Sequence, residues 1–186
     1  WICLIIDVKR NELVYKTIDK ISESKEPLYL TSLACGIIGS STRMEWMVEK
    51  AIEIGVNCIY VFETSRTKKS KANITRLNKT AIAALKQSRK SFLPKIEAIG
   101  LEELVVKPFV KKYIAICDGM SHPQLIKSQV TGKNLVLIGP EGDCSQEEIQ
   151  LCLDNDFEPC SLGNERLRSE TAAIYSLICQ NLKFNI

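Results

Sequence analysis

Two glycine-bearing loops in the C-terminal half of the chain hold the residues best suited to bind a ligand. The first loop, Ile138-Gly139-Pro140-Glu141-Gly142-Asp143, follows an apolar segment and leads into the N-terminus of an expected helix. Its glycines let the backbone approach a ligand closely, and Pro140 stiffens the path. The chain has no Gly-x-Gly-x-x-Gly and no Gly-Lys-Ser/Thr motif, which excludes the usual dinucleotide and P-loop sites. A plain strand-to-helix turn is the alternative role for this loop.

The second loop, residues 162–171, carries two arginines and two glutamates beside the start of a helix. Ser169 can cap that helix, and Glu170 suits its positive end. Arg166 and Arg168 are unfavourable there, because the helix N-terminus already carries partial positive charge. Two cations at this position indicate an anionic partner or a network with carboxylates.

A basic segment occupies residues 64–96, which contain ten lysines and arginines and no acidic residue. The rest of the chain has 15 basic and 22 acidic residues, so the net charge of +3 hides a strong segregation. Residues 73–90 are expected to form a helix, and its buried stripe comprises Ile74, Leu77, Ala81, Ile82 and Leu85. The opposite face carries Arg76, Lys79, Lys86 and Lys90. This pattern favours RNA, bound through phosphates, over an ordinary solvated helix face.

The cysteine and histidine content gives no sign of a metal centre. The eight cysteines include no Cys-x-x-Cys pair, and His122 is the one histidine. Most of the cysteines fall in apolar segments, which is typical of small buried side chains in a reducing cytoplasm. No apolar run approaches the about 18 residues that a membrane-spanning helix needs. We therefore expect no metal and no membrane contact.

The elements that must position these loops alternate between strands and helices. Residues 2–8 and 12–18 are expected to pair as strands, with a turn at Arg10 and Asn11. Apolar segments of strand length follow at 28–38, 57–62, after Pro94, 113–117, 134–138 and 157–162, separated by helices. The spacing Thr42 to Glu45 and Ser145 to Glu148 predicts two capping boxes, and Gly55 closes the first helix. This order predicts an α/β fold with a parallel sheet from residue 28 onward.

Several of these motifs occur together in one known family. The segments Arg43-Met44-Glu45-Trp46, Gly139-Pro140-Glu141-Gly142 and Leu167-Arg168-Ser169-Glu170-Thr171-Ala172-Ala173 appear in this order. Residues 28–182 thus resemble the RsmE family, the 16S ribosomal RNA uridine-N3 methyltransferases of the SPOUT superfamily. Asp143 departs from the family, which usually has a second glycine there.

The resemblance implies a fold, an assembly and a location. It implies a SPOUT domain at residues 28–186 with a C-terminal trefoil knot. Residues 1–27 are expected to be the end of a PUA-like β-barrel, most of which is missing because the chain looks clipped at Trp1. The resemblance further implies a homodimer in the cytoplasm that acts on small-subunit ribosomal RNA.

The same resemblance assigns the site residues. The cofactor is expected to be S-adenosylmethionine. Arg168 is expected to stabilise the uridine anion, and Glu170 to orient the arginine. The residues expected to bind the cofactor are Leu137, Ile138, Gly139, Pro140, Glu141, Gly142, Leu162, Gly163, Leu167, Arg168, Ser169 and Thr171. The residues expected to bind RNA are Arg43, Arg66, Lys68, Lys69, Arg76, Lys79, Lys86, Arg89 and Lys90.

Two other functions remain open at this point. A SPOUT enzyme could methylate another acceptor, such as a ribose 2′-OH or a different base. A catalytically silent RNA-binding module would explain the basic segment but leave both loops without a role.

Overall fold

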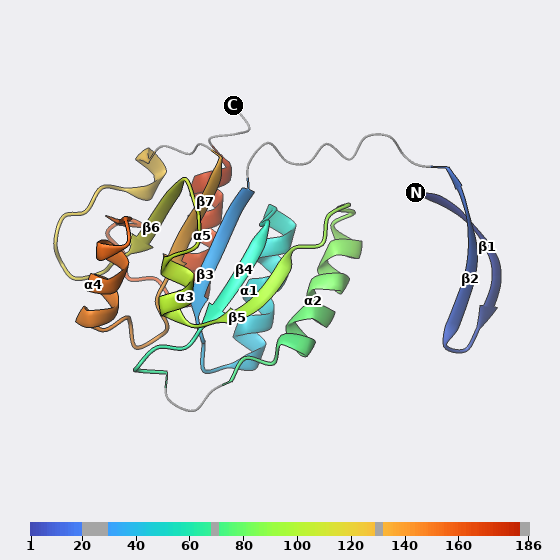
Figure 1. The fold of residues 1–186 in the computed structure, drawn as a ribbon, viewed down its shortest axis with the longest axis horizontal. Coiled ribbons are helices and arrows are strands. Elements are labelled where there is room, and N and C mark those ends of the chain that lie inside the picture. Colours follow the sequence, from blue (N-terminus) through green and yellow to red (C-terminus); the bar gives the residue numbers. More distant parts are fainter. Residues whose placement is uncertain (20–29, 68–70, 129–131, 183–186) are drawn as a thin grey trace.

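The computed structural model describes residues 1–19, 30–67, 71–128 and 132–182, and its main body is an α/β fold (Figure 1). The elements are β1 Ile2–Lys9, β2 Glu12–Asp19, β3 Leu30–Gly36, α1 Ser41–Ile54, β4 Cys58–Phe62, α2 Ile74–Gln87, β5 Lys95–Ile99, α3 Leu101–Val105, β6 Lys111–Ala115, η1 Leu125–Lys127, β7 Lys133–Ile138, α4 Gln146–Asp154, β8 Phe157–Cys160 and α5 Ser169–Asn181.

Six strands form one parallel sheet in the order β5-β4-β3-β7-β6-β8. Both faces are covered, so the central strands are mostly apolar and β4 is buried along its whole length. Leu33 and Cys35 face the side packed by α1, α2 and α5, whereas Ala34 faces the side packed by α3 and α4. The predicted parallel α/β sheet is confirmed.

Two of the expected helix caps are confirmed, and two others are wrong. The capping box of Ser145 and Glu148 is present, and Gly55 ends α1 with φ 103°. Thr42, however, does not cap α1, because Ser40 takes that position and its hydroxyl accepts the Arg43 amide. Ser169 likewise lies inside α5, and Arg168 is its N-cap residue without a side-chain bond. Polar residues at adjacent positions compete for a cap, and the path of the incoming chain selects one.

Helix α2 ends at Gln87, three residues before its expected end. Its buried residues are Leu77, Ala81 and Ala84, and Ile82 is 41% exposed, so the prediction that Ile82 is buried is wrong. Arg89 follows with φ 52°, a left-handed conformation that cannot continue a helix.

Strands β1 and β2 form an antiparallel hairpin whose residues are all exposed. The predicted turn at Arg10 and Asn11 is confirmed. The expected polar linker at residues 22–26 lies outside the described residues. In the described part of the chain, no helix is both long and apolar enough to cross a membrane, and no three His, Cys, Asp or Glu side chains gather as metal ligands.

One glycine allows the sheet and the first glycine-bearing loop to meet. Gly36 ends β3 directly beneath Pro140, and a Cβ at Gly36 would lie 2.6 Å from the Cδ and the N of that proline. Such a distance is shorter than any van der Waals contact, so β3 can end here only with a glycine.

We expect the substitution Gly36→Ala to destabilise the fold by about 1–3 kcal/mol, because the methyl group must displace the Pro140 backbone. Urea unfolding would measure the loss. The matched control is Gly100→Ala, whose Cβ would meet only the flexible Glu102 carboxylate, at 3.5 Å. Equal stabilities of the two variants would contradict this prediction.

Candidate active site

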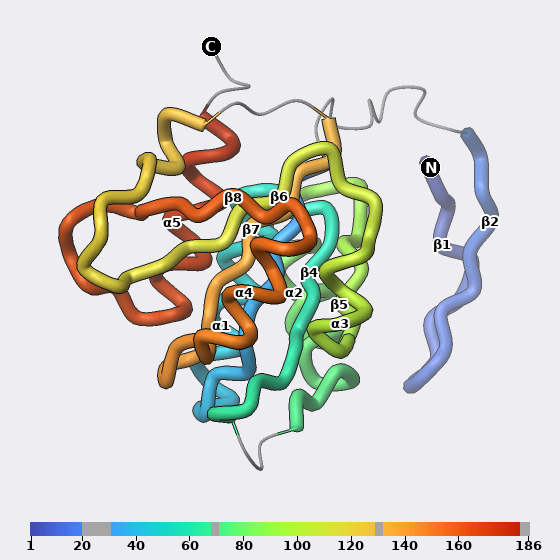
Figure 2. The backbone as a smooth tube through the Cα atoms, turned by 60° about the vertical axis from the view of Figure 1, so that its left-hand side comes forward, coloured from blue at the N-terminus to red at the C-terminus, as the bar shows by residue number. Residues whose placement is uncertain are grey.

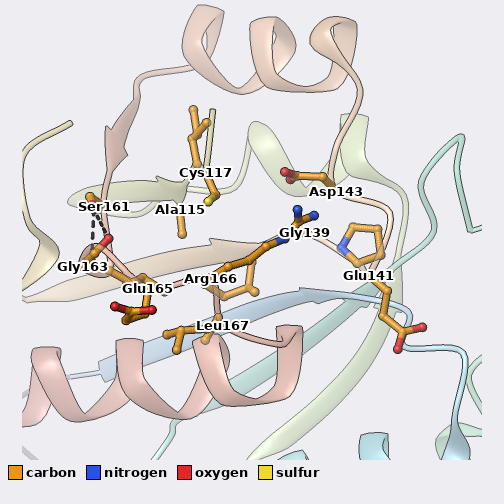
Figure 3. Close-up of a pocket in the computed structure, with 15 residues that line it drawn as sticks. Ala115, Cys117, Gly139, Glu141, Asp143, Ser161, Gly163, Glu165, Arg166 and Leu167 are labelled. Atoms are coloured by element: carbon orange, nitrogen blue, oxygen red, sulfur yellow. Dashed lines mark hydrogen bonds between the residues drawn. The ribbon is translucent and has the colours of Figure 1, made fainter. Parts of the chain in front are cut away.

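A cavity opens at the carboxyl ends of β6, β7 and β8, where parallel α/β sheets bind their ligands (Figure 3). Its walls come from residues 115–117 at the end of β6, from the loop between β7 and α4, from the loop between β8 and α5, and from Ala172 of α5. The lining combines apolar side chains with backbone and four charged side chains, Glu141, Asp143, Glu165 and Arg166.

The β7–α4 loop is held in a tight turn. The Asp143 amide donates to the Pro140 carbonyl at 2.9 Å, and the Asp143 carboxylate accepts the Cys144 amide at 2.9 Å. Asp143 has φ 63°, a conformation that aspartate tolerates better than most residues. A Cβ at Gly139 would lie 3.3 Å from the Cys144 amide nitrogen, so the backbone at Gly139 lines the cavity without a side chain.

The loop after β4 holds this turn from the outside. Arg66 donates to the Gly142 carbonyl at 2.7 Å. The Ser65 amide donates to the Glu148 carboxylate at 2.7 Å, and the same carboxylate accepts the Ser145 amide at the start of α4. Arg66, which we expected to bind RNA, therefore supports the β7–α4 loop.

Arg43 joins the two glycine-bearing loops to α1. Its Nε donates to the Glu170 carboxylate at 2.7 Å, its Nη2 donates to the second oxygen of that carboxylate, and its Nη1 pairs with Glu141. This two-point contact fixes both the position and the plane of the guanidinium. Glu170 was expected to orient Arg168, but the arginine that it bonds is Arg43.

The charges in this network stabilise each other. The Arg43 hydrogen bond lowers the pKa of Glu170 below its usual range, against the opposing effect of burial. The bond to Glu170 also raises the pKa of Arg43. Beneath them, burial raises the pKa of the Cys35 thiol to about 12, with the Glu170 charge adding to the effect. Glu170 is therefore a fixed carboxylate, and Cys35 a neutral thiol.

Arg168 lies outside the cavity. It is exposed, and it borders a second, shallow hollow formed with Thr42, Arg43, Trp46, Glu170 and Thr171. No other described side chain is hydrogen-bonded to its guanidinium. The two hollows are linked by Glu141, Arg43 and Glu170, since Glu141 lines the first hollow and Glu170 the second.

The β8–α5 loop is anchored at both ends. The Ser161 hydroxyl accepts the Gly163 amide and donates to the Gly163 carbonyl, both at 3.1 Å, and Gly163 has φ 122°. Leu167 packs against the core under α5. The loop can therefore present the intervening side chains to the cavity.

The structure brings seven of the expected cofactor residues to the cavity wall. They are Ile138, Gly139, Pro140, Glu141, Leu162, Gly163 and Leu167. The other five lie elsewhere: Leu137 is buried in the sheet, Gly142 faces Arg66, Ser169 is buried at the start of α5, and Arg168 and Thr171 border the second hollow.

Sequence reasoning missed the segment at the end of β6. Ala115, Ile116 and Cys117 line the cavity, and β6 ends at Ala115, whereas the expected strand ran to Cys117. The position of this segment after an apolar strand was the available signal, because the carboxyl ends of parallel strands share one edge. Asp143, Ser161, Glu165, Arg166 and Ala172 complete the lining that was not predicted.

The expected RNA-binding residues divide into free and paired groups. Lys79, Lys86 and Arg89 are exposed on or just after α2, and Lys90 is partly buried. Arg76 is paired with Glu45 of α1 at 2.6 Å. Lys68 and Lys69 lie outside the described residues.

The fold and the cavity define the class of protein: an α/β protein with its ligand site beyond the carboxyl ends of a parallel sheet. Residues 24–180 match the RNA methyltransferase domain family, and this chain belongs to it.

Individual relatives agree with this assignment. The ribosomal RNA small subunit methyltransferase E of Mesomycoplasma hyopneumoniae is 30% identical over 168 residues, which cover 86% of this chain and 73% of the relative. A solved Porphyromonas gingivalis protein, described as a probable rRNA-methyltransferase, has a TM-score of 0.86 and 31% identity, over 98% of this chain and 78% of its own. A Legionella pneumophila protein solved with bound SAM has a TM-score of 0.81 and 26% identity, over 97% of this chain and 77% of its own.

The contact between Arg43 and the buried Glu170 should contribute to the stability of the fold. We expect Arg43→Ala to destabilise the protein by about 1–3 kcal/mol at pH 7, because it leaves the Glu170 carboxylate, 7% exposed, without its partner. The folded-state pKa of Glu170 is lowered, so its contribution is complete above the ordinary value of 4.5 and is lost as the pH falls through the folded pKa. The difference between wild type and variant should therefore shrink in acid, as urea unfolding at several pH values would measure.

Two controls separate this effect from the loss of a surface charge. Lys50→Ala on the same helix removes a partly exposed surface contact with Glu49 and Glu53 and should change stability by less than about 1 kcal/mol. Adding Glu170→Gln to Arg43→Ala should recover part of the loss. A double variant less stable than Arg43→Ala alone would count against the network.

Proposed function

We propose that this protein transfers a methyl group from S-adenosylmethionine to N3 of a uridine in small-subunit ribosomal RNA. The observation that carries the proposal is the cavity formed by the two glycine-bearing loops in a chain of the RNA methyltransferase domain family. The relative from M. hyopneumoniae is named as a small-subunit ribosomal RNA methyltransferase, and the L. pneumophila structure contains SAM in a similar fold.

The lining of the cavity fits this cofactor. Ile138, Leu162 and Leu167 provide apolar surface for an adenine ring, and the exposed backbone around Gly139 and Gly163 can hydrogen-bond its edge. The carboxylates of the lining suit the positive charge of a sulfonium and an amino group. When bound, the cofactor would supply a methyl group that is ready for transfer, so no metal is needed.

The chain itself would then bind, orient and stabilise charge. Proximity of the two reactants supplies much of the acceleration of such a transfer. A uridine must lose its N3 proton, and the exposed Arg168 guanidinium would stabilise the resulting anion. Arg43 and Arg168 line this hollow with Glu170 as the one carboxylate, so its lining carries a net positive charge.

The RNA would bind along α2. Lys79, Lys86 and Arg89 lie exposed at this helix, and none of them is paired with a carboxylate in the described part of the chain. Phosphates can therefore reach them at little cost.

We place the catalytic unit in a homodimer. Tyr175, Ile178 and Leu182 are between 38% and 49% exposed and recur along one face of α5, and Trp46 of α1 is 44% exposed. This apolar face adjoins the hollow with Arg168, so a two-fold interface here would bring that arginine close to a partner subunit.

Two finer features of the fold belong to the same proposal. Helix α5 packs against β3 at the centre of the sheet and against η1, although it follows the edge strand β8 (Figure 2). The C-terminal chain therefore returns from the edge of the sheet to its centre and packs against the segment that connects β6 and β7. Such a return supports a trefoil knot. The exposed apolar side chains of the hairpin, such as Ile5 and Ile6, support its place in a PUA-like β-barrel unit at residues 1–27.

Because the proposed substrate is ribosomal RNA, we expect the enzyme to act in the cytoplasm.

The direct test is methylation of small-subunit ribosomal RNA by the purified protein with labelled S-adenosylmethionine, followed by mass mapping of the product. A methyl group at uridine N3 supports the proposal. A methyl group at a ribose 2′-OH or another base would contradict the acceptor, and no transfer with tight RNA binding would favour a silent module.

Cys117 offers a test of where the cofactor binds. It lines the cavity, and only Cys117 and Cys3 of the eight free cysteines are exposed. In the Cys3→Ser protein, S-adenosylhomocysteine at ten times its Kd should slow alkylation of Cys117 by iodoacetamide about tenfold, because the free fraction falls by that factor. The control is the alkylation rate of Cys3 in the wild-type protein, which the ligand should not change because Cys3 does not line the cavity. Unprotected Cys117 at saturation would locate the ligand elsewhere.

The exposed lysines of α2 should set the salt dependence of RNA binding. Lys79→Gln and Lys86→Gln should each weaken binding and lower the slope of log K against log salt by about one. Lys50→Gln is the control, since Lys50 is bonded to Glu49 and Glu53 on α1. Filter binding across a salt series would measure the slopes. An unchanged slope in the Lys79/Lys86 double variant would show that α2 is an ordinary solvated helix face that does not bind RNA.

Arg168→Ala should lower the rate of methyl transfer about 10²–10³-fold, because the developing anion loses its stabilising cation. Dimerisation and the affinity for S-adenosylhomocysteine should persist, as sedimentation and calorimetry would show. Near-normal turnover would refute the role of Arg168. A monomer at micromolar concentration in the wild type would independently refute the dimer.

A further inference from the structure

Arg166 extends across the candidate cofactor cavity. In Figure 3 its side chain runs from the β8–α5 loop toward the loop that carries Gly139 and Asp143. The adjacent residue, Leu167, also lines the cavity and packs against the core at the same time. The bonds between Ser161 and Gly163 fix the start of this loop, so the direction of Arg166 follows from an anchored backbone.

The charge of Arg166 is not used within the described part of the protein. Three carboxylates line the same cavity, yet none lies within ion-pair distance of its guanidinium. Glu141 is paired with Arg43, and Asp143 accepts the Cys144 amide. Arg166 is thus the one cationic side chain among the described residues that line the cavity, and it has no acidic partner there.

The amino-acid end of the proposed cofactor needs both signs of charge. Its amino group and sulfonium are cations, which Glu141, Asp143 or Glu165 can attract, whereas its carboxylate needs a donor. An arginine can hold a carboxylate through two parallel hydrogen bonds. We propose that Arg166 binds the carboxylate of the amino-acid portion of S-adenosylmethionine and so selects a zwitterionic ligand; this inference rests on the proposed function.

The test compares two ligands that differ only in the carboxylate. Calorimetry would measure the affinities of S-adenosylhomocysteine and of its decarboxylated analogue, which keeps the amino group. Arg166→Gln should weaken binding of S-adenosylhomocysteine about 10- to 100-fold, the usual effect of a hydrogen bond to a charged group. It should change the affinity for the decarboxylated analogue by less than about twofold. Arg166→Lys should recover part of the loss, since it keeps the charge but not the fork.

The control is Arg10→Gln in the hairpin turn, which removes the same charge far along the chain from the cavity residues and should alter neither affinity. An equal loss for both ligands would overturn the proposal in favour of a structural role for Arg166. Unchanged affinities for both ligands would overturn the proposal as well. If the same variant then bound RNA more weakly, Arg166 would contact RNA and not the cofactor. If the wild type binds neither ligand, the proposed function itself fails, and the result is distinct from a failure of Arg166 alone.

Discussion

The parallel pairing of all six strands is the constraint on which the rest of the structure depends. Every strand ends at the same edge of the sheet, so three segments far apart in sequence meet there: residues 115–117, the β7–α4 loop and the β8–α5 loop. Helices cover both faces of the sheet, and this leaves the carboxyl ends of the strands as the place where backbone groups can bind a ligand. The contact of Gly36 with Pro140 shows how closely the sheet and the loop pack at that edge.

The Arg43 network divides this edge into two hollows with different chemistry. On one side, Glu141 faces the cavity with its glycine-bearing backbone; on the other, Glu170 faces the hollow with Arg168. Arg43 bonds both carboxylates, so one guanidinium connects the β7–α4 loop with the start of α5. A methyl donor and an RNA base need such an arrangement, because they must be held separately and yet at a fixed mutual distance.

The surface charge shows a similar division between neighbouring helices. Glu45, Glu49 and Glu53 recur along one face of α1, next to the exposed lysines of α2. Arg76 is drawn to Glu45, and Lys50 is held by the other two glutamates. In the proposed RNA complex, the unpaired lysines of α2 would attract the polyanion, whereas the glutamates of α1 would not.

The amino-acid sequence by itself determined the α/β class, the order of the elements, the capping box at Ser145 and the two glycine-bearing loops. These features depend on local periodicity and on residues a few positions apart, so they can be predicted without the fold. Only the tertiary structure decided which side chains meet. It paired Glu170 with Arg43 across 127 positions, placed Arg66 on the Gly142 carbonyl, brought Cys117 to the cavity and left Arg168 outside it. Such pairings depend on which strands become neighbours and on how each loop turns, and a local pattern contains neither.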